Sequence, residues 1–185
     1  MAKVRVGVVG YGTIGERIAD GVAAQGDMEL VGVCDIAPTV PVRALIKSRK
    51  DIPLYCAAAE RIKDLEAAGG KVAGTLEDLL GKVDMICDAT TPGIGAQNRK
   101  KYEAAGVKAT FQAGEKTGVG DVQFNSMANY DKAYGQSYIH ILSCNNFNRI
   151  TVILFSPGYS MQIDQNIRFN CFCSFYYFLN RSSYD

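Results

Sequence analysis

The sequence predicts an α/β protein with a Rossmann-type, doubly wound and mostly parallel sheet. Three observations predict this fold. Short β-branched runs alternate along the chain with stretches whose apolar residues recur at helical intervals. The first run, 4–9, breaks into glycines spaced G-x-G-x-x-G, and a helical stretch follows at once. An acidic residue, Asp35, stands about twenty residues beyond the last of these glycines.

The glycine motif predicts a cradle for a dinucleotide diphosphate. Gly10 allows a sharp turn, Gly12 removes the Cβ that would keep the backbone from a pyrophosphate, and Gly15 lets helix and strand pack closely. The helix that begins near Thr13 directs its free N–H groups and positive dipole end at the phosphate. Glycine also serves turns and close helix packing, but here a strand precedes the motif and a helix follows it.

Asp35 predicts the choice of coenzyme. Residues 28–34 form a second apolar run, and Asp35 stands at its carboxyl end. A carboxylate there accepts hydrogen bonds from the adenosine ribose diol and repels a 2′-phosphate, so we expect NAD to be preferred and NADP to be second. The alternative is that Asp35 merely opens the loop 36–39.

Composition excludes several classes of protein. The chain has 185 residues and a net charge of +1, enough for one full core and part of another, with no basic excess for nucleic acid. No apolar run approaches the roughly 20 residues of a membrane helix, and the first residues do not resemble a signal peptide. None of the six cysteines forms a C-x-x-C pair, so we expect buried thiols in a reducing cytoplasm and no metal site.

The remaining elements continue the alternation. After Asp35 we expect helices at 42–50 and 57–68, a strand at 71–74, a helix capped by Thr75, a strand at 83–89, a helix at 95–105, and strands at 107–112 and 138–143. Ligands of such sheets lie outside the carboxyl ends of the strands, so the loop 90–93 is a candidate coenzyme wall. Gly114 would allow backbone close to the nicotinamide side. Ordinary loop and turn chemistry would produce the same residues at both places.

Several blocks together resemble the archaeal-type phosphorylating glyceraldehyde-3-phosphate dehydrogenases, from about residue 3 to residue 145. The blocks are GYGTIG at 10–15, GTLEDLL at 74–80, DAT at 88–90, FQAGEK at 111–116, NYD at 129–131 and SCN at 143–145. The resemblance implies that Thr13, Ile14 and Gly114 touch the coenzyme and that Cys144 is the nucleophile. It also implies that Ser143, Cys144 and Asn145 touch the substrate.

The implied reaction is the oxidation and phosphorylation of D-glyceraldehyde 3-phosphate to 1,3-bisphosphoglycerate in glycolysis and gluconeogenesis. A Cys144 thiolate adds to the aldehyde, hydride passes to the nicotinamide, and inorganic phosphate cleaves the thioester. The implied partners are therefore a triose phosphate and phosphate, with neither nucleic acid nor membrane, and the implied location is the cytoplasm. The family is homotetrameric, but this chain lacks the half that forms the tetramer interface. Without the resemblance, Cys144 would be interpreted as a buried thiol at a strand end.

Two departures from the family bear on the coenzyme. The family usually carries Asn where Val9 stands, a residue that braces the glycine turn, so we expect weaker coenzyme affinity. It commonly carries Lys where Asp35 stands, which suits NADP, so this departure strengthens the expected preference for NAD.

The resemblance stops after Asn145. Residues 146–185 contain no alanine, lysine or glutamate and are crowded with aromatic residues. We therefore expect a dinucleotide-binding domain over 1–145, ending at the nucleophile, and a tail over 146–185 that is disordered or a frame-shifted product in place of the catalytic α+β domain. The family's histidine base is not found, because His140 lies on the strand that leads to Cys144 and is interpreted as structural. We expect impaired activity, and the alternatives are a nucleotide-binding pseudoenzyme fragment or another cysteine-dependent semialdehyde dehydrogenase.

Overall fold

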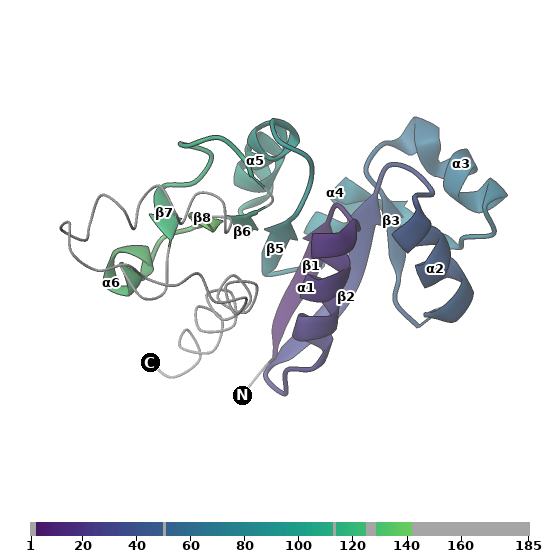
Figure 1. Cartoon of the computed structure of the whole chain (residues 1–185), viewed down its shortest axis with the longest axis horizontal. Helices are drawn as coiled ribbons and strands as arrows, with labels where there is room; N and C mark the ends of the chain where they lie inside the picture. Colours follow the sequence, from purple (N-terminus) through teal and green to yellow (C-terminus); the bar gives the residue numbers. More distant parts are fainter. Residues whose placement is uncertain (1–2, 50, 113, 125–128, 142–185) are drawn as a thin grey trace, which may run out of the picture.

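A computed structural model describes residues 3–49, 51–112, 114–124 and 129–141. Within these ranges the chain forms one parallel sheet with helices on both faces (Figure 1). The strand order is β4-β3-β2-β1-β5-β6-β8-β7, and every pair of neighbours is parallel. The predicted doubly wound sheet is therefore confirmed. The tail, 146–185, lies outside the described residues.

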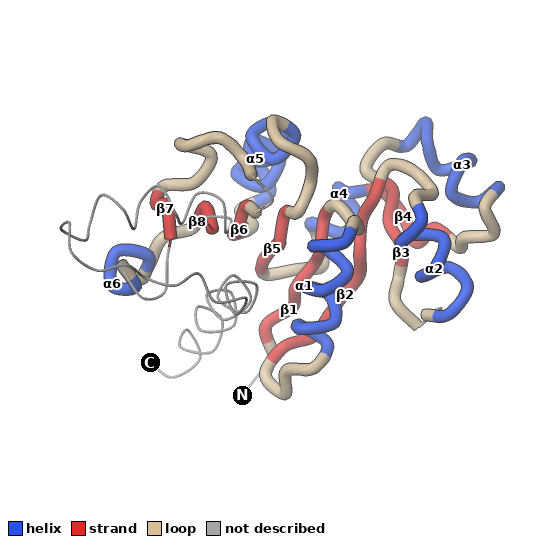
Figure 2. The backbone as a smooth tube through the Cα atoms, viewed as in Figure 1, coloured by secondary structure: helices blue, strands red, loops and turns tan. Residues whose placement is uncertain are grey.

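The strands and helices have the following bounds, and Figure 2 shows the strands as a row from β3 and β4 at one end to β7 and β8 at the other. The strands are β1 Val4–Val9, β2 Met28–Asp35, β3 Leu54–Cys56, β4 Val72–Thr75, β5 Met85–Asp88, β6 Lys108–Phe111, β7 Val122–Phe124 and β8 Tyr138–Ile141. The helices are α1 Thr13–Ala23, α2 Val40–Ser48, α3 Ile62–Ala67, α4 Leu76–Leu80, α5 Ile94–Ala105 and α6 Tyr130–Ala133, and a 3₁₀ turn, η1 Ala59–Arg61, precedes α3.

Two apolar layers hold the helices against the sheet, because successive side chains of a strand point to opposite faces. On β5, Cys87 belongs to the layer that packs under α1, α2, α3 and α6, whereas Ile86 belongs to the layer under α4 and α5. Cys34, Cys56 and Cys87 are buried free thiols, as the sequence predicts. No helix in the described ranges is both long and apolar enough to cross a membrane.

Most of the predicted elements are present, with two differences. The expected helix at 57–68 begins as the 3₁₀ turn and becomes α-helical only at Ile62. Strands β3 and β7, of three residues each, were not expected. The start of α4 confirms its predicted cap: the Thr75 hydroxyl accepts from the N–H of Asp78, and the Asp78 carboxylate accepts from the N–H of Thr75.

Candidate coenzyme site

One row of paired residues crosses the carboxyl edge of the sheet. Cys34 pairs with Val9, Val9 with Asp88, Asp88 with Phe111, and Phe111 with His140. The loops that follow β2, β1, β5 and β6 therefore begin side by side. The strand order reverses between β1 and β5, and a dinucleotide in an open α/β sheet binds outside the carboxyl ends at that point.

The turn after β1 needs its first and last glycines. Gly10 has a φ of +85°, and a Cβ there would lie 2.7 Å from the backbone nitrogen of Thr90. A Cβ on Gly15 would lie 2.0 Å from the carbonyl oxygen of Gly10. The turn is thus packed between the helix that follows it and the loop after β5, as predicted for these two glycines.

Gly12 differs, because a Cβ there would meet no heavy atom within 4 Å. Gly12 is the N-cap of α1, no side chain caps this helix end, and Thr13 and Ile14 begin its first turn, whose N–H groups lack partners within the helix. The backbone therefore presents hydrogen-bond donors and the positive end of α1 to an open space. This arrangement fits a diphosphate, and a side chain at position 12 would occupy the same space.

Asp35 is held at the rim beside this turn. Its Oδ2 accepts a hydrogen bond of 2.8 Å from the Tyr11 N–H, and its Oδ1 accepts from the N–H groups of Ile36 and Ala37 at 2.7 and 3.2 Å. The carboxylate thus stands at the carboxyl end of β2, where the sequence places it. The bond to Tyr11 joins the second strand to the glycine turn and was not expected.

A buried carboxylate braces the loop after β5. The Oδ1 of Asp88 accepts from the backbone N–H of Thr90 at 3.0 Å and from the Thr90 hydroxyl. Its Oδ2 accepts from the Tyr102 hydroxyl at 2.7 Å and from the Asn98 amide at 3.0 Å. Both oxygens are used, so the start of this loop is tied to α5. Sequence reasoning gave Asp88 no role, although an acidic residue that ends an apolar strand was a usable signal.

Gly114 lies across the same loop. Its φ is +82°, and a Cβ on it would lie 4.0 Å from the Cγ of Pro92. This left-handed conformation favours glycine at position 114, and it is compatible both with the expected approach to the nicotinamide side and with ordinary turn chemistry. The candidate wall at 90–93 therefore has the glycine turn on one side, through Thr90, and Gly114 on the other, through Pro92.

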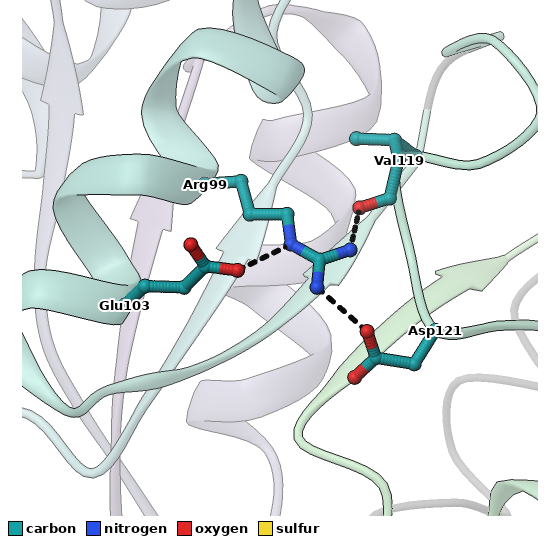
Figure 3. A network of polar contacts seen from close by, with 4 residues as sticks. All are labelled: Arg99, Glu103, Val119 and Asp121. Atoms are coloured by element: carbon teal, nitrogen blue, oxygen red, sulfur yellow. Dashed lines mark hydrogen bonds and ion pairs between the residues drawn. The ribbon is translucent and has the colours of Figure 1, made fainter.

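The far part of the loop that carries Gly114 is anchored on α5 (Figure 3). The Arg99 guanidinium donates to the Glu103 carboxylate at 2.7 Å, the Val119 carbonyl at 2.8 Å and the Asp121 carboxylate at 2.6 Å. It also lies 4.7 Å above the centre of the Tyr138 ring. A planar guanidinium with several fixed partners holds a loop more rigidly than a single ion pair does.

His140 is a buried residue of β8 and is not a candidate for the general base of the reaction. It is 1% exposed, and neither ring nitrogen has a hydrogen-bond partner among the described residues. Burial lowers the pKa of His140, and the negative charge of Glu115 opposes that shift only in part. The ring is therefore neutral near pH 7, which agrees with its interpretation as a structural histidine.

Ser143, Cys144 and Asn145 lie outside the described residues. Their places relative to the glycine turn remain predictions, and so do the coenzyme contacts assigned to Gly10, Gly12, Thr13, Ile14, Gly15, Asp35 and Gly114. In the described ranges, no cluster of three or more His, Cys, Asp or Glu residues could hold a metal ion.

Comparison with known proteins gives the family context. The chain is 51% identical over 143 residues to the glyceraldehyde-3-phosphate dehydrogenase of Thermococcus kodakarensis and 52% identical over 143 residues to that of Pyrococcus abyssi. The chain is homologous to the N-terminal part of archaeal glyceraldehyde-3-phosphate dehydrogenase. The enzyme of Archaeoglobus fulgidus, 48% identical over 146 residues, agrees with this.

The match is partial in both directions. It takes in 77% of this chain, but the chain spans only 42% of the length of the Thermococcus kodakarensis or Pyrococcus abyssi dehydrogenase. The relatives carry the name glyceraldehyde-3-phosphate dehydrogenase, and the resemblance stated from the motifs is confirmed. No protein-family model matches the sequence.

Solved structures give only a weak likeness. An NAD-binding protein from Listeria innocua is 19% identical with a TM-score of 0.44, over 81% of this chain and 41% of that one. The apo scyllo-inositol dehydrogenase from Lactobacillus casei is 13% identical with a TM-score of 0.44, over 60% of this chain and 28% of that one. The fold assignment rests instead on the strand order of this chain.

Proposed function

We propose that this chain is the coenzyme-binding half of a phosphorylating glyceraldehyde-3-phosphate dehydrogenase and that it binds NAD at the carboxyl edge of its sheet. The observation that carries the proposal is the open space at Gly12, above a helix N-terminus without a side-chain cap. The two flanking glycines, Gly10 and Gly15, are each required by close packing. Of the three glycines of this motif, only Gly12, which would face the diphosphate, has free space beside it.

The coenzyme would be held by groups along the whole edge. The first turn of α1, at Thr13 and Ile14, would bind the diphosphate, and Asp35 would bind the adenosine ribose. Because its two oxygens already accept three backbone N–H groups, the Asp35 carboxylate is fixed in place. A fixed negative charge repels a 2′-phosphate, so NAD is the preferred coenzyme and NADP the weaker one.

The chemistry of the reaction would use Cys144 as nucleophile, with Ser143 and Asn145 beside the substrate. When bound, the coenzyme supplies the acceptor for the hydride that leaves the substrate carbon once the cysteine sulfur has added to the aldehyde. The chain's part is to position that thiol, and inorganic phosphate would then cleave the thioester to an acyl phosphate and release the thiol. A triose phosphate and phosphate are the proposed small-molecule partners.

The single histidine of this sequence, His140, favours binding without efficient turnover. It is buried in the sheet, so it has no access to a proton on a substrate. We therefore expect the 185-residue chain to bind NAD and to oxidise glyceraldehyde 3-phosphate at or below detection.

Two measurements test the proposal. Calorimetric titration with NAD and NADP should show binding of NAD in preference to NADP, and the absence of binding of either coenzyme would contradict the coenzyme site. Reduction of NAD with glyceraldehyde 3-phosphate and phosphate should be undetectable, and a rate typical of dehydrogenases would contradict the assignment of this chain as a binding half.

Alkylation tests the proposed nucleophile separately. The rate of Cys144 modification by a thiol reagent, followed across pH with and without NAD, reports the pKa of that thiol. A pKa well below that of a free thiol would support the role of Cys144, whereas the pKa of a free thiol would count against it.

A further inference from the structure

The loop after β5, residues 89–93, lies between the two ends of the proposed coenzyme site. It meets the glycine turn through the backbone of Thr90, which a Cβ on Gly10 would approach to 2.7 Å. On its other side, a Cβ built on Gly114 would lie 4.0 Å from the Cγ of Pro92. The position of this loop is therefore related to both the glycine turn and Gly114.

Glu115, the residue after Gly114, fixes the far end of that loop. Its Oε1 accepts a hydrogen bond of 2.9 Å from the Gly93 N–H and one of 2.7 Å from the Gly95 N–H. These donors belong to the N-terminus of α5, whose own N-cap residue is a glycine and carries no side chain. The missing cap is thus supplied by the loop after β6, twenty residues further along the chain.

The packing around this contact is tight. A Cβ on Gly95 would lie 2.8 Å from Oε1 of Glu115, so any other residue at position 95 would displace the carboxylate from its present place. Glu115 is 3% exposed, and its second oxygen, Oε2, has no partner among the described residues. A buried carboxylate with one oxygen unpaired is costly, and a short neutral side chain would cap a helix without that cost. The cost suggests that the carboxylate does more than end a helix.

We infer that Glu115 is a positioning residue for the nicotinamide half of the coenzyme. By tying the loop after β6 to the N-terminus of α5, it sets Gly114 at a fixed distance from the glycine turn that holds the diphosphate. Asp88 braces the start of the loop after β5 and Glu115 braces its end, so this candidate coenzyme wall is held at both ends. The inference rests on the proposed function, in which this edge binds NAD.

The test compares two ligands that differ only in the nicotinamide. Calorimetric titration of the full chain with NAD and with ADP-ribose should show that Glu115→Ala weakens NAD by about tenfold, because Gly114 is no longer held in place, while ADP-ribose changes by less than about twofold. Glu115→Gln should stay within about threefold of the parent for both ligands, because its amide oxygen can still accept from Gly93 and Gly95.

Asp78→Ala is the matched control. The Asp78 carboxylate accepts a hydrogen bond of 2.7 Å from the backbone N–H of Thr75, at the start of α4. Thr75 ends strand β4, and strands β3, β2 and β1 lie between β4 and β5. This variant removes a helix cap of the same kind away from Gly114, so it should lose stability without changing either affinity.

Amide hydrogen exchange of the free protein tests the hydrogen bonds between Glu115 and the start of α5 directly. Exchange at Gly95 should rise at least about tenfold in Glu115→Ala and remain near the parent rate in Glu115→Gln. An unchanged rate at Gly95 in Glu115→Ala would overturn the inference without reference to any ligand.

The binding outcomes separate two failures. Equal weakening of NAD and ADP-ribose by Glu115→Ala, no weakening of either, or a Gln variant as weak as the Ala variant would overturn the positioning role alone. A parent chain that binds neither ligand would overturn the proposed function and this inference with it.

Discussion

The Cβ that Gly15 lacks would lie 2.0 Å from the carbonyl oxygen of Gly10. The neighbouring atom is backbone, so it cannot move aside as the end of a side chain could. Helix α1 therefore sits against the glycine turn at a distance that only glycine at position 15 permits, and this contact sets where the first N–H groups of the helix lie.

Gly15→Ala should consequently destabilise the protein and abolish coenzyme binding together. Forcing a methyl group into a closed backbone contact costs about 3 kcal/mol or more, since either α1 or the turn must shift. Urea unfolding followed by circular dichroism would measure the loss. A variant that keeps the parent's free energy of unfolding would contradict the observed packing.

Gly12→Ala is the matched variant with the opposite expectation for stability. Its new methyl group would meet no heavy atom within 4 Å, and the backbone φ of −89° is ordinary for alanine. The free energy of unfolding should change by less than about 1 kcal/mol, while NAD affinity falls by at least about tenfold because the methyl group occupies the diphosphate's place. Unchanged NAD affinity would argue against this turn as the cradle.

Asp35→Asn should erode the preference for NAD. The substitution removes the negative charge that repels a 2′-phosphate and weakens the hydrogen bonds to the ribose, so the ratio of NAD to NADP affinity should fall by about tenfold. Asp64→Asn, an exposed carboxylate of α3 paired with Arg61, serves as the control and should leave the ratio unchanged. Titration of both variants with the two coenzymes gives the ratio directly.

Local signals explain which parts of the fold the sequence predicts. The bounds of β1 agree at both ends, since a β-branched run meets glycine, and α4 begins at its predicted cap, since Thr75 and Asp78 contact each other three residues apart. Strands β3 and β7 have three residues each, too few for alternation to mark them. They are strands because β2 and β8 offer them an edge.

The candidate site likewise has one part that local sequence signals predict and one part that they do not. The places of Gly10, Gly15 and Asp35 follow from a motif that one strand, one turn and one helix complete among themselves. The bracing carboxylates were not predicted as such. Glu115 finds its partners twenty residues upstream and Asp88 reaches ten and fourteen residues downstream, through contacts that exist only once the sheet has formed.

Alkaline pH should destabilise the chain through its buried thiols. Burial raises the pKa of Cys87 to about 12 and raises that of Cys34 further, from an ordinary value of 9.0. Since the folded state keeps these protons longer than the unfolded state does, their contribution is complete below pH 9 and is lost as pH rises toward 12. Cys87→Ala should therefore lose a smaller fraction of its neutral-pH stability at pH 10 to 11 than the parent does, as urea midpoints would show. A parallel decline in both proteins would contradict this.

Acidic pH should also destabilise the chain, here through His140, whose pKa is shifted in the opposite direction to those of the thiols. Burial lowers its pKa below the ordinary 6.5, so the unfolded state binds the proton more readily than the folded state does. The contribution of His140 to the free energy of unfolding is therefore complete above pH 6.5 and is lost as pH drops toward the lower folded pKa.

Glu115 is the charged group that opposes this loss, because its carboxylate favours the protonated ring. His140→Leu cannot take up the proton, so its urea midpoint should decline less between pH 6.5 and 5 than that of the parent. Glu115→Gln keeps the histidine but removes the opposing charge, so its urea midpoint should decline more steeply than that of the parent. If the two backgrounds gave the same slope, the buried ring and the buried carboxylate would not be electrostatically coupled, and the pH dependence would have to come from other carboxylates of the chain.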